Sequence, residues 1–293
     1  MAWTTDDLLS SIKNRAMIPD ASSGSLSPAA LLNFASEELI LRLAGAITSC
    51  REKYYETYVD TAVAAGVATF QIPTRALGST VAAVQFLYQN RMRPLQPIDP
   101  ASITNTDTAL EPTHFYFQNN SVVIYPTPTN ATGTVRLRYY QRPNRLEQTA
   151  NCAQVTAIGT GNVTVAAAPS TWSTNTQVDF IPQTASQATP YGLNSVVTGV
   201  TGNVISFSAL PAALAVGDWL ALAEFTPIPE IPFEFQVVLA QAAACSALDA
   251  INDQPALQGA SAKLDKYLEA AVKLLTPRDK AGKKIVVSGW RRY

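Results

Sequence analysis

The chain has few residues suited to catalysis, and its single histidine limits the options further. His114 is the only histidine, so any Ser-His, Cys-His or multi-histidine metal arrangement has to be built around it. It lies in the aromatic segment THFYF, and neither a nucleophile elbow nor an HExxH motif accompanies it. We therefore interpret His114 as a structural residue of a strand, and we predict that the protein is not an enzyme.

Two further patterns can be read as chemical sites. Gly159 and Gly161 are spaced like part of a phosphate-binding loop, but a third glycine and a following Lys-Ser/Thr pair are missing. A hairpin turn is the favoured interpretation. Asp249 and Asp253 lie four residues apart near a predicted helix end, where they can ligate a cation or act as acid and base. Capping or solvated carboxylates are commoner, and we predict no cofactor and no metal.

A strand predicted from Thr134 to Arg142 carries a basic and aromatic face. Strand alternation places on one face Val135, Leu137 and Tyr139. It places on the other face Arg136, Arg138, Tyr140 and Arg142. The second face can contact DNA phosphates or an acidic neighbouring subunit. The alternative is an exposed strand face whose charges maintain solubility.

The last segment, Arg278 to Tyr293, is basic and lacks a helical period. Because it cannot form a core alone, it is either an arm that adds a strand to the sheet edge of a partner or a frayed tail. As an arm, its docking residues are Arg278, Lys280, Lys283, Lys284, Ile285, Val286, Val287, Trp290, Arg291, Arg292 and Tyr293.

Charged residues are scarce and unevenly distributed. They make up 15% of the 293 residues, against 47% hydrophobic, and the net charge is -1. Such a surface is either rich in Ser, Thr and Asn or covered by neighbouring subunits. Residues 146–262 contain no Lys or Arg. Their acids include Asp179, Asp218, Glu224, Glu230, Glu234, Asp249 and Asp253. This acidic stretch can repel DNA.

The sequence predicts no membrane association and a reducing place of synthesis. The first residues carry acids where an export signal has basic residues, and no run approaches the roughly 18 apolar residues of a membrane span. Cys50, Cys152 and Cys245 are odd in number and lack CxxC spacing. We expect synthesis in a cytoplasm.

Helical patterns occupy both ends of the chain. Thr4 and Asp7 form a capping box for a short first helix. Ser27 and Pro28 suit the start of a second, longer helix. The apolar stripe of that helix is Leu32, Ala35, Leu39, Leu43, Ile47, Cys50, Tyr54 and Tyr58. After the proline-rich linker 226–232, helices are predicted over 233–251 and 255–275, joined by a short link that favours an antiparallel hairpin.

Strand patterns occupy the middle. Candidate strands are 81–88, 115–117, 122–125 and 134–140. Residues 150–225 resemble an insertion of two hairpins that turn at Gly161-Asn162 and Gly202-Asn203. The predicted class is α+β, in which the terminal helices form one bundle and the insertion forms a small β-barrel or sandwich. The predicted segments are 1–66 (helices), 67–149 (β-rich), 150–225 (inserted β domain), 226–276 (helical hairpin) and 277–293 (basic arm).

Several motifs, in a fixed order, resemble a family of tailed-bacteriophage virion proteins with head-to-tail connector roles. The resemblance begins at FQIPTRALG (70–78) and FYFQNNSVVIYPTPTNATGTVRLRYYQRPNRL (115–146). It continues through VGDWLAL (216–222), TPIPEIPFEF (226–235) and LLTPRDKAGKKI (274–285). It therefore spans most of the chain, with the insertion at 150–225 as the departure.

The resemblance implies an adaptor of the virion neck, made in the bacterial cytoplasm. Such adaptors dock beneath the portal protein as a homo-oligomeric ring, commonly of twelve copies, and meet tail or further neck proteins. Genomic DNA passes through the centre during ejection without sequence-specific binding. A C-terminal extension commonly reaches the portal, which would give 278–293 its role.

A second hypothesis is a tail or tail-fibre component whose β domain binds host glycans. Trp172, Tyr191 and Trp219 are the aromatic residues that would contact a sugar, and a place in the core is the alternative for all three. Removal of 150–225 would abolish host binding under this hypothesis, whereas removal of 278–293 would abolish neck assembly under the first.

Overall fold

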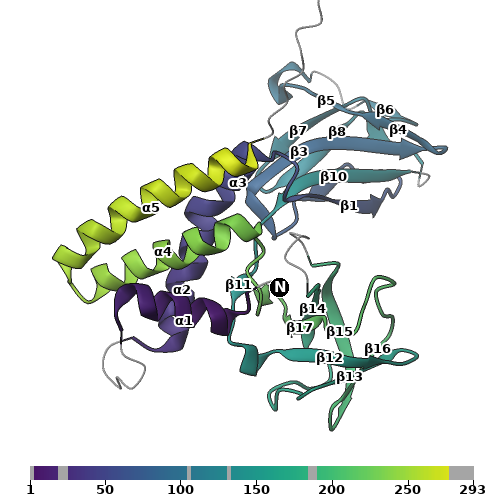
Figure 1. Cartoon of the computed structure of the whole chain (residues 1–293). Coiled ribbons are helices and arrows are strands. Elements are labelled where there is room, and N and C mark those ends of the chain that lie inside the picture. The colour runs from purple at the N-terminus through teal and green to yellow at the C-terminus, as the bar shows by residue number, and fades with distance from the viewer. Residues whose placement is uncertain (1–2, 19–25, 104–106, 131–132, 184–189, 277–293) are drawn as a thin grey trace, which may run out of the picture.

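The computed structural model describes residues 3–18, 26–103, 107–130, 133–183 and 190–276. It confirms the α+β class: a helical bundle, a two-sheet sandwich and a barrel lie in three separate parts of the molecule (Figure 1). The helices are α1 (Thr5–Ala16), α2 (Pro28–Glu38), a π-helical turn (Leu39–Leu43), α3 (Ala44–Cys50), α4 (Phe233–Ala250) and α5 (Gln254–Leu275), with 3-10 turns at Pro100–Ser102 and Thr149–Asn151.

Helix α4 is the centre of the bundle. It contacts α1, α2 and α5, and between Phe235 and Leu248 nearly every residue is buried. Its alanines leave room for these neighbours to approach closely, and α5 returns antiparallel to it as predicted. The predicted capping box of Thr4 and Asp7 is present at α1. The helices from both ends of the chain therefore share one apolar core.

The long second helix differs from its prediction in two ways. It ends at Cys50, and Glu56 already begins a strand, so the helical stripe predicted through Tyr54 and Tyr58 was wrong beyond Cys50. The segment ETYVDTA is β-prone, and here strand pairing overrides the helical period. A π-helical turn at Leu39–Leu43 also interrupts the helix. Residues four positions apart do not lie directly in line on an α-helix, which has 3.6 residues per turn. The π-helical turn has more residues per turn, and both of its ends, Leu39 and Leu43, are buried in the core.

The β-rich segment forms a two-sheet sandwich. One sheet has the order β1-β10-β3-β4 and the other β2-β8-β7-β5, with β6 and β9 paired beside them. Apolar residues of both sheets form one core. The strands are β1 (Glu56–Ala62), β2 (Thr69–Gln71), β3 (Ala76–Tyr88), β4 (Arg91–Pro94), β5 (Gln96–Pro97), β6 (Thr108–Ala109), β7 (His114–Gln118), β8 (Ser121–Tyr125), β9 (Thr127–Pro128) and β10 (Thr134–Gln141).

The insertion forms a closed barrel of order β12-β13-β16-β15-β14-β17. The predicted turns lie at the tips of its hairpins, where Gly161 and Gly202 have positive φ of 74° and 58°. The barrel strands are β12 (Ala153–Ile158), β13 (Asn162–Val165), β14 (Gln177–Ile181), β15 (Gly192–Thr201), β16 (Val204–Phe207) and β17 (Trp219–Leu222).

The chain enters and leaves the barrel at one place. Strand β11 (Arg145–Leu146) pairs in parallel with β18 (Phe225–Thr226), directly before and after the inserted segment. The extended segment after β18 then leads to α4, which begins at Phe233 with Pro232 as its N-cap. This junction brings the bundle, the sandwich and the barrel together.

Candidate interaction surfaces

The basic face predicted on β10 exists, and its arginines pair with carboxylates. The alternation is as predicted, since Val135, Leu137 and Tyr139 are buried. Arg136 forms a two-point ion pair with Asp60 of the adjacent strand β1, at 2.7 Å for both Nε–Oδ1 and Nη2–Oδ2.

The other arginines of this face have partners as well. Arg138 Nε lies 2.7 Å from Glu56 Oε1, and Arg142 Nη2 lies 3.0 Å from Glu224 Oε2. The hydrogen bond from Arg136 lowers the pKa of Asp60 below its usual value. Tyr140 lies on the same face, where burial is the first cause that raises its pKa. The positive charge of this surface is therefore compensated within the protein.

A buried polar cluster connects the sandwich to the barrel. Arg75, directly before β3, donates from Nη1 to Asp179 Oδ2 at 2.6 Å and from Nη2 to Asp179 Oδ1 at 3.0 Å. Asp179 belongs to β14 and is fully buried. Its carboxylate also accepts the backbone N–H groups of Asn194 and Glu224. Buried charges of this kind are tolerated when they are paired and hydrogen-bonded.

The same cluster reaches the bundle through Asn144 and Glu230. The Asn144 side chain donates to Asp179 Oδ2 at 2.8 Å, and its backbone N–H donates to Glu230 Oε2 at 3.1 Å. Glu230 Oε1 has no hydrogen-bond partner. Burial raises the pKa of Glu230 to about 8, because the charged carboxylate loses its hydration. Its backbone carbonyl accepts the Tyr55 hydroxyl at 2.9 Å.

Sequence reasoning missed this cluster as a unit. Arg75 and Asp179 are 104 positions apart, and nothing in their neighbourhoods marks them as partners. One signal was available: Asp179 stands in the apolar run QVDFI, where a carboxylate needs a cation or several N–H donors.

The barrel surface is uncharged, and the exposed acids of the stretch 146–262 include Glu234, Asp249 and Asp253, which lie outside the barrel. Residues 153–222 contain two acids, Asp179 and Asp218, and no Lys, Arg or His. Both acids are buried. Asp218 accepts the N–H groups of Gln183 and Ala215 and the hydroxyl of Tyr191. Repulsion of DNA needs exposed charge, and the barrel offers none.

The aromatic residues considered for sugar binding lie in or against the barrel core. Trp172 is buried within it. The ring of Tyr191 packs on this core while its hydroxyl bonds to Asp218. Trp219 is half-buried beside a small second cluster. All three residues thus contribute to apolar packing of the barrel, and Trp172 is buried while Tyr191 and Trp219 are partly exposed.

The remaining residues considered for chemistry have structural environments. His114 lies in β7, and its Nδ1 is 2.8 Å from the Thr113 hydroxyl. Gly159 and Gly161 lie in the turn between β12 and β13. Asp253 caps α5 by accepting the Ala256 N–H. Within the described ranges, no group of three or more His, Cys, Asp and Glu is arranged to hold a metal ion.

Other predictions concern the cysteines, the arm and the membrane. Cys50, Cys152 and Cys245 are free thiols, and burial raises the pKa of the last two. The predicted arm, Arg278 to Tyr293, lies outside the described residues. Among the described helices, none combines the length and the apolar character needed to cross a bilayer.

These parts define a structural protein in which buried contacts hold three folded parts together. The family model described as SU10 adaptor protein matches residues 3–160, from α1 to the second residue beyond β12. The match covers more than half of the chain, and the chain belongs to this family. It is accordingly a bacteriophage adaptor protein with a structural role in the virion. A search of the curated proteins found no match.

Proposed function

We propose that the protein is a ring-forming subunit of the head-to-tail connector, which docks on the portal protein and surrounds the path of the DNA. The family match over residues 3–160 is the observation that carries this proposal. The matched segment includes α1, α2, α3 and the whole sandwich. In this proposal the bundle and sandwich form the body of the ring, and the barrel is the addition of this chain.

The distribution of charge supports the proposal. Interfaces between subunits are depleted in charged residues at their centres, and only 15% of this chain is charged. The barrel surface neither attracts nor repels phosphate, which suits a component that DNA passes without binding. On β10, the arginines already have carboxylate partners. This favours a neighbouring subunit over DNA as the contact of Arg136, Arg138, Tyr140 and Arg142.

We assign portal docking to the basic arm, residues 278–293. Six of its residues are Lys or Arg, against one acid, and an extended segment can add a strand to the sheet of a partner. Because each copy contributes one arm, weak individual contacts become a stable attachment through multivalency.

The test is the mass and electron-microscopic symmetry of the full chain, alone and mixed with the portal of the same phage. We expect a stoichiometric ring on the portal. A variant that lacks residues 278–293 should fold like the full chain, as judged by circular dichroism, and fail to bind the portal. A full chain that ignores the portal would refute the proposed function, and a truncated chain that still binds would refute the role of the arm.

A further inference from the structure

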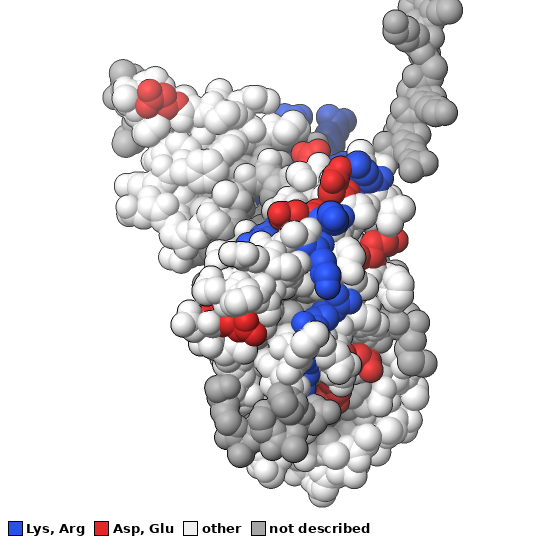
Figure 2. Space-filling view, turned by 60° about the vertical axis from the view of Figure 1, so that its left-hand side comes forward, with Lys and Arg blue, Asp and Glu red and all other residues white. Residues whose placement is uncertain are grey.

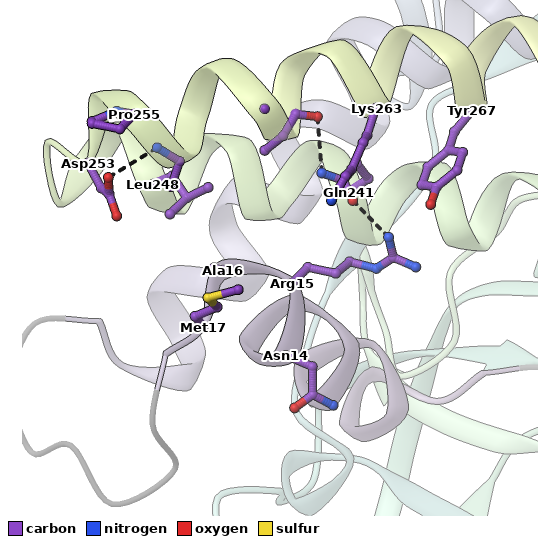
Figure 3. Close-up of a pocket in the computed structure, with 13 residues that line it drawn as sticks. Asn14, Arg15, Ala16, Met17, Gln241, Leu248, Asp253, Pro255, Lys263 and Tyr267 are labelled. Carbon is purple, nitrogen blue, oxygen red and sulfur yellow. Dashed lines mark hydrogen bonds between the residues drawn. The ribbon is translucent and has the colours of Figure 1, made fainter.

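A groove runs across the bundle between the end of α1 and the first half of α5 (Figure 3). Its volume is about 400 Å³. The floor is apolar, with the buried side chains of Leu248 and Ala260. At Gly259 an added Cβ would meet no atom within 4 Å, so the groove is open beside the backbone of α5. Met17, at the end of α1, is 88% exposed at its edge.

Two cations line this groove. The Arg15 guanidinium is held across it, since Nη1 donates to Gln241 Oε1 at 2.7 Å and the group lies 5.7 Å from the ring centre of Tyr267. Lys263 is exposed and forms no ion pair with any described residue. The single acid, Asp253, is engaged in capping α5. Figure 2, which brings the helical side forward, shows basic side chains in a row with acidic side chains beside them. The groove therefore suits an apolar side chain with a carboxylate beside it.

The chain carries such a pair of residues on α2 and the π-helical turn. Leu41 is 82% exposed, although Leu39 and Leu43 on either side of it are fully buried. Glu37, one turn earlier, is also exposed and forms no ion pair with any described residue. An aliphatic side chain and a carboxylate thus project together from the outer face of this helix.

The groove and Leu41 lie on opposite sides of α4. Leu248 and Gln241 of α4 face the groove, whereas Ser246 donates to Glu38 of α2 at 3.1 Å. Helical positions two apart point about 200° apart, so α2 and the groove flank α4 on opposite sides. Figure 1 agrees, since the long helix of α2 and α3 crosses behind α4. Leu41 lies on the outer side of that helix, because its neighbours in sequence face the core.

We propose that the groove between α1 and α5 of one copy receives Leu41 of a second copy, with Glu37 of that copy against Lys263 and Arg15. Since the two surfaces differ and lie on opposite sides of the bundle, the contact is head-to-tail and can repeat around a ring. The inference rests on the proposed function and names one interface of the ring. The charges of the groove and of the projecting helix are complementary, which fixes the register of the contact.

Cysteine cross-linking tests the contact in the assembled protein. The variant combines Leu41→Cys with Gly259→Cys on a Cys50→Ser background, and the complex with the portal is oxidised. We expect a ladder of covalent oligomers up to the size of the ring. The matched control combines Gly259→Cys with Leu110→Cys, an exposed residue of the sandwich, and should give no ladder.

Charge reversal tests the same contact without a change in the groove floor. Lys263→Glu and Glu37→Lys, each alone, should raise the concentration needed for ring formation on the portal roughly fivefold or more. The two changes together should restore it to within about twofold.

The outcomes separate this inference from the proposed function. A ladder together with charge rescue supports the interface. Rings of normal symmetry without a ladder and without charge rescue overturn the interface and leave the connector function in place. Failure of the unmodified chain to form a ring on the portal overturns the connector function and this inference with it.

Discussion

Two arginine–aspartate pairs of nearly identical geometry lie in contrasting surroundings. Arg75 and Asp179 form a two-point ion pair at the junction of sandwich and barrel, with side chains 5% and 0% exposed. Arg136 and Asp60 form a two-point pair between β10 and β1, with side chains 24% and 38% exposed. The distances of all four contacts lie between 2.6 and 3.0 Å.

Geometry alone does not determine how much an ion pair contributes to stability, because the surroundings of its charges differ. At the surface, water and salt screen the charges, and removal of one partner leaves the other hydrated. In the junction, removal of Asp179 leaves the Arg75 charge buried without compensation and deprives two backbone N–H groups of their acceptor. The buried pair therefore joins the barrel to the sandwich by a contact whose loss is costly, whereas the surface pair lies on a solvent-exposed face.

The largest effect is expected from Asp179→Ala. Loss of one partner of a buried pair costs about 3–5 kcal/mol of stability, which a urea unfolding curve measures directly. Asp179→Asn keeps the volume and one acceptor oxygen, so it separates the loss of charge from the formation of a cavity. We expect Asp179→Asn to lose a large part of the stability that Asp179→Ala loses.

Limited digestion with trypsin tests the same prediction at the junction of the sandwich and the barrel. Residues 146–262 contain no Lys or Arg, so the barrel cannot be cut, and Arg145 is an exposed site directly before it. In Asp179→Ala we expect faster cleavage after Arg145 under native conditions. A protein with unchanged urea midpoint and unchanged cleavage would show that the pair does not fix the barrel.

The next effect concerns Glu230 and depends on pH. Its pKa is raised from 4.5 to about 8 by burial, so the folded protein holds a proton that the unfolded chain releases near pH 4.5. Unfolding therefore becomes easier as the pH rises from about 4.5 to 8, and the loss levels off above that window. Asp179 and Arg75 act on this carboxyl with opposite signs. Tyr54 and Tyr55 are further titratable groups that interact with it.

Glu230→Gln should remove this dependence. The amide keeps the shape and an acceptor for the Asn144 N–H without a charge to desolvate. At pH 9 we expect the urea midpoint of the variant to be higher than that of the unmodified chain. Towards pH 5 the two midpoints should converge. Parallel curves for the two proteins across this range would show that Glu230 does not titrate in the window.

What the sequence could predict follows from the range of each interaction. The alternation of β10, the capping box at Thr4 and the positive φ at Gly161 and Gly202 depend on neighbouring residues, and all were predicted correctly. The end of the second helix was not, because Tyr54 and Tyr58 continue a helical period that strand pairing of β1 with β10 overrides.

The candidate surfaces divide in the same way. The basic face of β10 was predictable from alternation, but the carboxylates that compensate it come from β1 and from Glu224, 82 positions from Arg142. The groove combines residues from three helices at both ends of the chain. Such contacts depend on the packing of distant segments, which one sequence does not reveal.

The smallest effect is expected at the surface pair. Asp60→Asn removes the carboxylate next to Arg136, but the guanidinium stays over the Tyr58 ring, 3.9 Å from its centre, and remains in contact with water. We expect a small shift of the urea midpoint at low salt, and none at about 0.5 M salt, where the Debye length is below roughly 5 Å. Asp179→Asn, measured at the same two salt concentrations, should lose a similar amount at both, because water and ions do not reach that pair. If Asp60→Asn were as destabilising as Asp179→Asn, burial would not distinguish the two pairs. The surface pair would then contribute as much to the stability of the sandwich as the buried pair contributes to the junction.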